Sequence, residues 1–486
     1  METQGIVIAE DCAASIQNEN NLNDKHKKKD NGIGFGYCKK CCNPRTDFVW
    51  CTQCDTSALI DVFSTWTSGN SLIDKAIQKT QKESKTYIGY LEFIPYDRFS
   101  KIEILGQGGF GTVFKAYWSD GEKCYYRKVP GNRYFLTSRE SSMKRVDPIN
   151  DELLNKKTRT TPIYVVLKFL HNSDNISEEF LNEVMIYYGC NNRIDVHFLY
   201  TFNCYGITRH PETGNYGMVL PYAPEGDLRQ YLKKNHMKLS WYDKVEIMLD
   251  LVRNLHLIHE KGFVHGDIHS GNILHVNNRT YIVDLGLARP ADRPASDENG
   301  THGIITYMAP EILQGQPRTQ ASDIYALGIV LYEICSGKAP FHDKKYDGIL
   351  QYQIWKGLRP EPEDGTPKCM ISLMKLCWDD NPSKRPNSLA VLEIIRPWFG
   401  AISLEISNLD FEDTGTLKPI REDIDQAEQK RLILNSNLTT AKSHPEVHTY
   451  SQYVPYVQMS NANDILRSST NDSNIDSADS FWNLNS

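Results

Sequence analysis

Apolar and polar residues alternate with different periods along this 486-residue chain, and the period predicts the kind of element. Runs of β-branched and aromatic residues are typical of strands, and such runs cover residues 92–99, 112–118, 163–168 and 281–284. Apolar residues three and four positions apart predict helices over 71–83 and 177–186. The chain therefore combines strands with amphipathic helices.

The first helical pattern lies in residues 57–96, which we interpret as a linker with one short helix. Ser71 is the expected cap of this helix, which ends near Glu83. Its apolar stripe consists of Leu72, Ile73, Ala76 and Ile77. A stripe of this kind is typical of a helix that packs on a neighbouring surface.

The composition changes at both ends of the chain. Residues 1–36 are rich in Asn, Lys and Asp with few large apolar groups, so we expect a disordered N-terminal tail. Residues 400–486 are rich in Asn, Ser, Asp and Thr. We expect a largely disordered C-terminal tail there, with one short helix near 422–434.

The overall composition limits the classes of function. Hydrophobic residues make up 40% and charged residues 24%, and the formal net charge of −7 argues against a general nucleic-acid or membrane-surface role. No apolar run approaches the length of a membrane span, and the acidic start does not resemble a signal peptide. We expect a cytoplasmic protein. The basic run 25–29 is typical of a solvated face, with a nuclear signal as the alternative.

Four of the 12 cysteines form two Cys-X-X-Cys pairs. They are Cys38, Cys41, Cys51 and Cys54. In a reducing compartment, clustered cysteines more often hold metal than form disulfides, and four thiolates suit tetrahedral Zn²⁺. We therefore interpret residues 37–56 as a zinc module whose folding energy comes from the metal. Cys42 is a spare for Cys41, and unmetallated or redox-active thiols are the alternative.

Residues 106–111 have the sequence Gly-Gln-Gly-Gly-Phe-Gly, the pattern Gly-X-Gly-X-X-Gly. Alone this pattern is weak, because dinucleotide-binding folds share it. Residues 112–118 are β-branched and aromatic, however, where a dinucleotide-binding fold would begin a helix. We therefore predict a loop that joins two strands and presents backbone N–H groups to phosphate oxygens.

Lys168 lies in a predicted strand, and Glu183 follows it by 15 residues in a predicted helix. A Lys–Glu ion pair of this kind orients the Lys on nucleotide phosphates. Lys128 is a rival, but it has no helical Glu at the right distance. The insert before Lys168, about 122–160, is polar and basic, and we expect an enlarged surface loop or hairpin.

The strongest chemical signal is the segment 264–272, Val-His-Gly-Asp-Ile-His-Ser-Gly-Asn, with an Asp-Leu-Gly beginning at residue 284. Asp267 can accept the proton of a hydroxyl group. Asn272 and Asp284 supply the hard oxygen ligands that Mg²⁺ prefers. This set is what phosphoryl transfer from a nucleotide requires.

The motifs above, in this order, resemble those of eukaryotic protein kinases. Two later segments add to the resemblance: Ala-Pro-Glu at 309–311, and Cys-Trp followed by Arg-Pro within 377–386. The segment 377–386 resembles the corresponding segment of tyrosine kinases and of tyrosine-kinase-like Ser/Thr kinases. The resemblance implies that Arg385 pairs with Glu311 and that Asp323 braces the catalytic loop.

The resemblance covers residues 97–398 and implies an α+β, bilobal protein-kinase fold. Its β-rich N-lobe would be 97–220 and its mainly helical C-lobe 224–398. The whole layout, with a Cys-rich segment and residues 66–70 before the kinase region, is similar to an expanded kinase-like family of arbuscular mycorrhizal fungi.

The same resemblance implies the cofactors ATP and Mg²⁺, with ATP bound between the lobes. The implied ATP-binding residues are Leu105, Gly106, Gln107, Gly108, Gly109, Phe110, Gly111, Val113, Lys168, Glu183, Pro221 and Ala223. Leu220 falls at the gatekeeper position. Pro221 lacks an N–H group, so the N–H group of Ala223 is the donor expected to face adenine. The implied catalytic residues are Asp267, Lys168, Asn272 and Asp284.

Four positions depart from the family pattern. Gly266 replaces the Arg that pairs with a phosphate on the activation loop, so we hypothesise that activity does not depend on phosphorylation of this loop. His269 stands where Ser/Thr kinases usually have Lys, and Ile304 where they have Thr, which leaves the acceptor residue open with Ser/Thr favoured. Leu285 in place of Phe is a volume-similar apolar change and predicts no loss.

We interpret the chain as an ATP-dependent protein kinase that acts on a protein substrate in intracellular signalling. The alternative is a catalytically inactive kinase-like scaffold that binds partners through the Cys-rich module and the tails. All five chemical residues are retained, which weighs against the scaffold. Nucleic-acid binding by the Cys-rich module is disfavoured because interleaved aromatic and basic residues are missing.

Overall fold

The computed structural model describes residues 35–108, 111–129, 133–138, 144–147, 151–170, 176, 178–191, 204–276, 278–291, 300–403, 417–435 and 451–456. Two compact units divide the chain, Met1–Tyr222 and Ala223–Ser486, which we call the N-unit and the C-unit. The predicted tail 1–36 lies outside the described residues except at its end, and so does the basic run 25–29.

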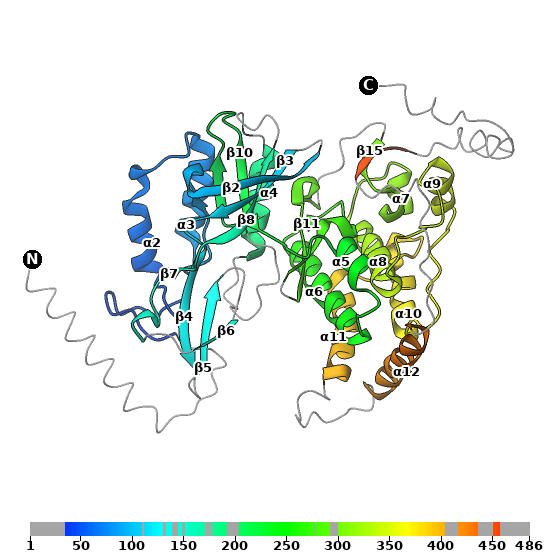
Figure 1. Ribbon diagram of the computed structural model, residues 1–486. Coiled ribbons are helices and arrows are strands. Elements are labelled where there is room, and N and C mark those ends of the chain that lie inside the picture. Colours follow the sequence, from blue (N-terminus) through cyan, green and yellow to red (C-terminus); the bar gives the residue numbers. More distant parts are fainter. Residues whose placement is uncertain are drawn as a thin grey trace, which may run out of the picture. The chain divides into compact units, whose positions relative to one another are not determined.

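The N-unit contains a six-stranded sheet with the order β1-β9-β10-β8-β3-β2 (Figure 1). Its strands are β1 (Glu92–Phe93), β2 (Phe99–Gly108), β3 (Gly111–Trp118), β8 (Ile163–Leu170), β9 (Gly206–Arg209) and β10 (Tyr216–Pro221). Neighbouring strands are antiparallel except β1 and β9, which are parallel. The predicted strand 92–99 is shorter than expected, because a 3-10 turn, Tyr96–Arg98, separates β1 from β2.

The glycine-rich segment joins two antiparallel strands, as predicted. β2 and β3 pair from Phe99 opposite Trp118 to Gly108 opposite Gly111. A hairpin here excludes the dinucleotide-binding alternative, which requires a helix directly after the glycines. Gly109 and Phe110 lie outside the described residues.

The insert forms a sheet of its own instead of a surface loop. The order of this second sheet is β6-β5-β4-β7. Its strands are β4 (Lys123–Val129), β5 (Arg133–Ser138), β6 (Lys144–Val146) and β7 (Thr158–Arg159). β4 and β5 make the expected hairpin, but Cys124 and Tyr125 of β4 are fully buried. The expectation of an exposed insert was wrong for β4, because the Phe48 ring and the Asp47 carboxylate cover Tyr125.

Three helices complete the described part of the N-unit: α2 (Thr52–Asp61), α3 (Ser71–Glu83) and α4 (Glu178–Asn191). The sequence did not predict α2. The bounds of α3 are those predicted, but its cap is Asn70, whose side chain accepts the N–H groups of Leu72 and Ile73. Leu72 is half exposed, whereas Ile73 is buried. α3 packs on α4, where the Tyr188 hydroxyl donates to the Thr80 carbonyl.

The C-unit is mainly helical. Its helices up to residue 403 are α5 (Leu228–Asn235), α6 (Trp241–Glu260), α7 (Pro310–Leu313), α8 (Gln320–Ser336), α9 (Gly348–Trp355), α10 (Lys368–Cys377) and α11 (Ser388–Ser403). Two short antiparallel pairs carry the motif residues: β11 (Phe263–Val264) with β14 (Arg289–Pro290), and β12 (Ile273–Val276) with β13 (Arg279–Ile282). α8 is buried from Ser322 to Ser336.

Two pieces of the predicted C-terminal tail belong to the fold. The expected short helix is present and longer than predicted, as α12 (Leu417–Asn435), and it packs on α11. β16 (Gln452–Pro455) pairs with β15 (Gly300–Gly303), which corrects the expectation of disorder for those residues. The other residues beyond 403 lie outside the described part. Within the described part, no helix combines the length and hydropathy that crossing a membrane requires.

Candidate active site

A buried carboxylate at the start of α8 fixes the segment 264–272, which the resemblance implies is the catalytic loop. Asp323 accepts hydrogen bonds from the backbone N–H groups of His265 (N to Oδ2, 2.8 Å) and Gly266 (N to Oδ1, 2.9 Å). Its Oδ2 also lies 3.0 Å from Nε2 of His259. The brace that the resemblance implied for Asp323 is confirmed.

Asp267 has two polar neighbours within the same loop. Asn272 Nδ2 donates to the backbone oxygen of Asp267 (2.9 Å) and lies 3.3 Å from its Oδ2. His269 Nε2 lies 3.6 Å from the same Oδ2. His269 Nδ1 accepts the N–H group of Gly271 (3.1 Å), so the ring proton is assigned to Nε2, which faces Asp267. His269 therefore contacts the carboxylate from the position where Ser/Thr kinases usually have Lys.

The surroundings keep Asp267 ionised although it is buried. Burial raises the pKa of Asp267, but the hydrogen bond from His269 and the positive charge of Arg318 outweigh burial and hold the pKa below its ordinary value. Asp267 is therefore a carboxylate at neutral pH and able to accept a proton.

Asp284 and Asn272 lie at the same end of the β12–β13 hairpin. The N–H group of Val283 donates to the carbonyl oxygen of Asn272 (2.9 Å) and so brings the next residue, Asp284, close to Asn272. Asp284 has φ 64° and ψ 71°, a left-handed conformation that residues other than Gly rarely adopt. Such strain costs on the order of 1 kcal/mol and concentrates at functional sites.

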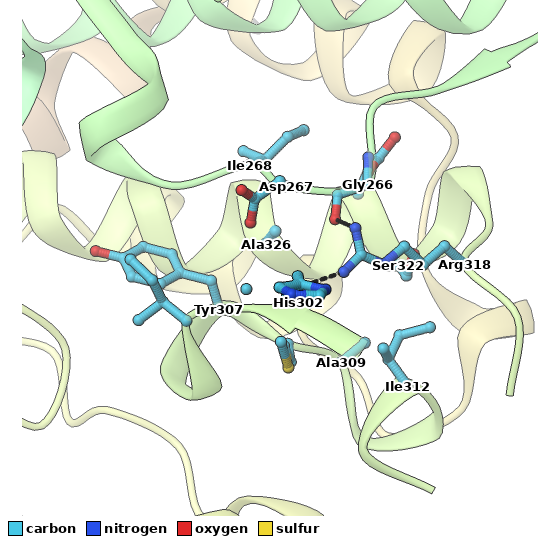
Figure 2. A pocket seen from close by; sticks show the side chains of 14 residues that line it. Gly266, Asp267, Ile268, His302, Tyr307, Ala309, Ile312, Arg318, Ser322 and Ala326 are labelled. Atoms are coloured by element: carbon cyan, nitrogen blue, oxygen red, sulfur yellow. Dashed lines mark hydrogen bonds between the residues drawn. The ribbon is translucent and has the colours of Figure 1, made fainter. Parts of the chain in front are cut away.

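Arg318 links the catalytic loop to β15. Its guanidinium donates to the backbone oxygens of Gly266 and His302 (Figure 2). Gly266 has φ +83°, and a Cβ atom there would lie 3.0 Å from Arg318 Nη1. Glycine thus leaves room for Arg318, so that a cation from another part of the chain stands beside the position where kinases usually have Arg.

A small pocket lies beside Asp267 (Figure 2). Gly303, Tyr307 and Arg318 are among the residues that line it. Its volume of about 30 Å³ suffices for water molecules but is far too small for a nucleotide. The pocket therefore adjoins the Asp267 carboxylate and is not the nucleotide site.

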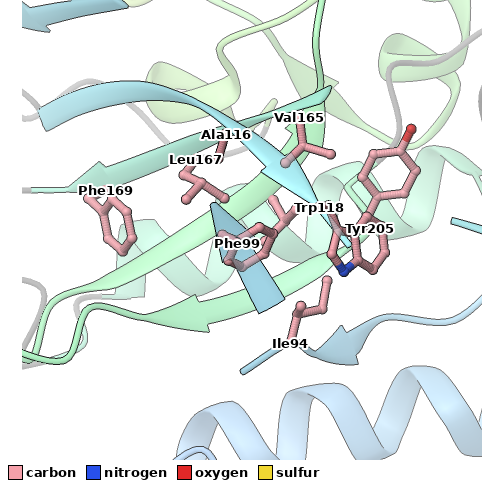
Figure 3. Close-up of a cluster of buried hydrophobic side chains, with 9 residues drawn as sticks. Ile94, Phe99, Ala116, Trp118, Val165, Leu167, Phe169 and Tyr205 are labelled. Carbon is pink, nitrogen blue, oxygen red and sulfur yellow. The ribbon is translucent and has the colours of Figure 1, made fainter. Parts of the chain in front are cut away.

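The ion pair predicted for the N-unit is present. Lys168 Nζ lies 2.9 Å from Glu183 Oε1, and Glu183 is 1% exposed. β8, which carries Lys168, is held by a cluster of apolar side chains (Figure 3). The cluster consists of Ile94, Phe99, Ala116, Trp118, Val165, Leu167, Phe169, Tyr205 and Val219. The rival Lys128 lies on β4, in the other sheet.

Several predicted nucleotide-binding residues form one row across the six-stranded sheet. Gly106 pairs with Val113, and Val113 pairs with Lys168. Leu105 is 49% exposed, while Leu220, at the expected gatekeeper position, is 5% exposed. Of the remaining predicted residues, Gln107 and Gly108 end β2, Gly111 begins β3, Pro221 ends β10 and Ala223 begins the C-unit.

The predicted pair of Arg385 and Glu311 is also present. The guanidinium donates to both carboxylate oxygens, with distances of 2.6 and 2.8 Å. The Arg385 side chain is fully buried. A two-pronged contact of this kind holds the segment at 309–311 against the helices that follow it.

The four predicted metal-ligating cysteines come together. The Sγ atoms of Cys38, Cys41, Cys51 and Cys54 all lie within 4.8 Å of one another. Cys42 is not a member of this cluster, so the spare cysteine does not replace Cys41. The cluster is joined to the insert: the Tyr125 hydroxyl donates to Asp47 Oδ1 (2.9 Å), and Lys157 forms an ion pair with Asp55.

Sequence reasoning missed a buried polar network beneath the catalytic loop. Tyr307 donates to Glu333 Oε2 (2.6 Å) and lies 3.3 Å from the Ser270 hydroxyl, which accepts a hydrogen bond from Arg229. It also missed Arg318. No local pattern marks these residues, because their partners lie far away in sequence. Gly266, which is unusual at its position, was the one sequence feature that pointed to Arg318.

This chain belongs to the protein tyrosine and serine/threonine kinase family, whose model matches residues 149–395, about half of the chain. The match begins within the insert, so β2, β3 and the glycine-rich loop lie outside it. Membership therefore rests on the segment from the end of the insert to α11.

Curated kinases from several organisms are similar to this segment. Receptor-interacting serine/threonine-protein kinase 1 of Homo sapiens is 34% identical over 210 residues, which cover 39% of this chain and 31% of that protein. Serine/threonine/tyrosine-protein kinase HT1 of Arabidopsis thaliana is 33% identical over 184 residues, which cover 37% and 47%. Dual specificity protein kinase shkC of Dictyostelium discoideum is 31% identical over 188 residues, which cover 37% and 36%. The chain spans less than half the length of each relative.

Proposed function

We propose that this protein is an active kinase that transfers the γ-phosphate of ATP to a hydroxyl group of a protein substrate. The observation that carries the proposal is Asp267, a largely buried carboxylate (12% exposed) whose pKa is held low, on a loop braced by Asp323. A scaffold without catalysis has no need of a buried acid kept ionised. Nothing among the described residues favours that alternative.

In the C-unit, Asp267 would take the proton of the acceptor hydroxyl while that oxygen bonds to the γ-phosphorus and ADP leaves. Asn272 and Asp284 would hold Mg²⁺, which neutralises charge on the phosphates. The residues fit this ion, because the Asn272 amide nitrogen donates to Asp267 and leaves Oδ1 as a ligand. In the N-unit, Lys168 oriented by Glu183 would neutralise phosphate oxygens, and the residues of the β2–β3 hairpin would cover the nucleotide.

We favour Ser and Thr over Tyr as acceptors and a role in cytoplasmic signalling. The name of the human relative, a serine/threonine-protein kinase, supports this acceptor type, while the other two relatives are named serine/threonine/tyrosine and dual specificity kinases. The clustering of four cysteines at metal-ligand spacing, which is typical of a reducing compartment, supports the cytoplasmic assignment. The similarity of the layout to the fungal family stays a prediction.

Transfer of labelled phosphate from ATP with Mg²⁺ to a generic protein substrate tests the proposal. We expect Asp267→Asn to lower kcat by a factor of about 10² to 10⁴, since it removes the proton acceptor. Asp343→Asn, at an exposed Asp of the same unit, is the matched control and should leave kcat unchanged. Acid analysis of the product distinguishes phosphoserine and phosphothreonine from phosphotyrosine. Equal activity of Asp267→Asn and wild type would refute the assignment.

We also propose that Cys38, Cys41, Cys51 and Cys54 hold a structural Zn²⁺ ion. A Zn–S distance of about 2.3 Å in a tetrahedron separates the sulfurs by about 3.8 Å. The Sγ atoms of Cys41 and Cys51 are 3.5 Å apart, and those of Cys38 and Cys54 are 3.9 Å apart, so the donors fit this ion. Metal analysis of the purified chain should find bound zinc, which Cys51→Ser loses and Cys42→Ser keeps.

A further inference from the structure

The chain returns to the proposed active site after α12. β16 pairs antiparallel with β15, with Gly300 opposite Pro455 and Gly303 opposite Gln452. In Figure 1, β16 is the red-orange strand next to the label of β15. These two strands form a sheet of their own among the described residues, so the backbone edge of β15 is taken by a segment of the same chain.

Side chains as well as the backbone hold this segment in place. Val454 is 1% exposed and Tyr453 is 49% exposed, as alternation along a docked strand requires. The Tyr453 ring lies 5.8 Å from the His302 ring, centre to centre. Gln351 of α9 donates to the Pro455 carbonyl (2.8 Å). The segment is thus seated on the C-unit through one buried side chain and contacts at both ends.

The register brings the first residue of the segment to the end of β15 that meets Asp267. A Cβ atom on Gly303 would lie 3.3 Å from Asp267 Oδ1, and both residues line the small pocket. Gly303 pairs with Gln452, and Ser451 is the next residue at that end. The Ser451 hydroxyl is buried and has no hydrogen-bond partner among the described residues. A buried hydroxyl left without a partner is unusual in a folded protein and calls for an explanation.

We propose that residues 451–456 are an acceptor segment bound in cis and that the same chain phosphorylates Ser451. This inference rests on the proposed kinase function. Ser451 Oγ forms a bond to the γ-phosphorus of ATP, the bond from that phosphorus to the bridging oxygen breaks, and ADP leaves. Asp267 takes the Ser451 proton. The explanation for the unpartnered hydroxyl is that it is an acceptor.

The same geometry defines how an acceptor peptide docks. Pairing with β15 supplies backbone hydrogen bonds that do not depend on sequence, and a buried side chain three residues after the acceptor, as Val454 is, supplies selectivity. The docked segment occupies the edge that a second protein substrate of this kind would use. Removing the segment from the edge is therefore expected to favour added substrates.

The test maps phosphorylation sites by mass spectrometry on the full chain incubated with ATP and Mg²⁺. We expect Ser451 to be labelled at a rate per molecule that dilution does not change, because a tethered acceptor has an effective concentration of millimolar order. Ser451→Ala abolishes this site, and Tyr453→Phe, the matched control in the same strand, retains it. Val454→Asp places a charge at the buried position and lowers the rate at Ser451 by about tenfold or more, as loss of tethered docking predicts.

Phosphorylation of an added generic protein substrate separates the two proposals. Val454→Asp should phosphorylate the added substrate at least as fast as wild type, which also shows that the variant is folded. Activity on the added substrate without label on Ser451 overturns the inference and leaves the kinase function standing. A rate at Ser451 that falls in proportion to dilution overturns binding in cis. If wild type phosphorylates neither itself nor the added substrate, the proposed function fails.

Discussion

Asp267 in the C-unit, whose side chain is 12% exposed, and Asp47 in the N-unit, which is fully buried, are both shielded carboxylates, and their surroundings act on them in opposite directions. Burial raises the pKa of each. At Asp267 the nearby His269 and Arg318 outweigh burial, whereas at Asp47 burial outweighs the hydrogen bond from Tyr125. The surroundings of Asp267 therefore favour its charged form, whereas those of Asp47 favour its neutral form.

This difference separates a site of chemistry from a structural contact. A buried acid by itself does not indicate function, since both residues are buried. Partners that outweigh burial and keep the acid ionised do indicate it, because proton transfer at neutral pH requires the charged form. Four experiments test this distinction.

The largest effect is expected for Arg318→Ala. Losing the bonds to Gly266 and His302 should misplace the catalytic loop against β15 and lower kcat by about a hundredfold. Removing this cation should also raise the pKa of Asp267. Because Asp267 must be ionised, the acid limb of the kcat profile then moves to higher pH. Measuring kcat against pH checks both effects, with Arg318→Lys, which keeps the charge, as the control. An acid limb that does not move would contradict the account of Asp267.

In the N-unit, Tyr125→Phe should affect stability and leave kcat unchanged. The variant removes the hydroxyl that donates to Asp47 Oδ1 (2.9 Å) and leaves the carboxylate less satisfied, which is expected to cost about 1 to 3 kcal/mol. Denaturant unfolding measures the loss. Tyr126→Phe, at the next residue of β4, is the matched control and should change little, because Tyr126 is only partly buried. A fall in kcat for Tyr125→Phe would remove the distinction between the two acids.

The candidate site residues of both units were predictable from sequence because the motifs that carry them encode their contacts. The pairs Lys168–Glu183 and Arg385–Glu311 and the brace by Asp323 were all expected, and all three are present. The hairpin at the glycine-rich loop was expected as well, since β-branched residues follow the glycines directly. In these cases local pattern and fold agree.

The insert and the C-terminal segment were not predictable for a physical reason. Tyr125 is buried by Asp47, which lies 78 residues away, and β15 pairs with a strand far along the chain. A polar sequence looks exposed when its partners cannot be identified from neighbouring residues. Lys123 is 3% exposed because its ammonium group donates to the Tyr90 carbonyl, a contact that no spacing rule contains.

A smaller effect is expected for Asp47→Asn. The Asn Oδ1 atom can still accept the Tyr125 hydroxyl and the Phe48 N–H group, so the free energy of unfolding at neutral pH should change by less than about 1 kcal/mol. The pKa of Asp47 is raised in the fold, so the native state holds this proton more tightly than the unfolded chain. Wild type therefore loses stability as pH rises through that raised pKa.

The Asn variant cannot lose that proton and should lack this part of the pH dependence. Unfolding midpoints of both proteins over a series of pH values measure the difference. An Asn variant that is much less stable than wild type at neutral pH, and as stable in mild acid, would show that Asp47 contributes as a charge after all.

The smallest effect, no change in kcat, is expected when the hydroxyls at Ser296 and Thr301 are removed together by substitution with Ala. Ser296 lies outside the described residues, and Thr301 belongs to β15. Arg318 already joins β15 to the catalytic loop, so no phosphate on these residues is needed to order it. Comparing kcat of the double variant with that of wild type, before and after phosphatase treatment, checks this. Near-complete loss of activity in the double variant would mean that a phosphate, and not Arg318, supplies the ordering charge.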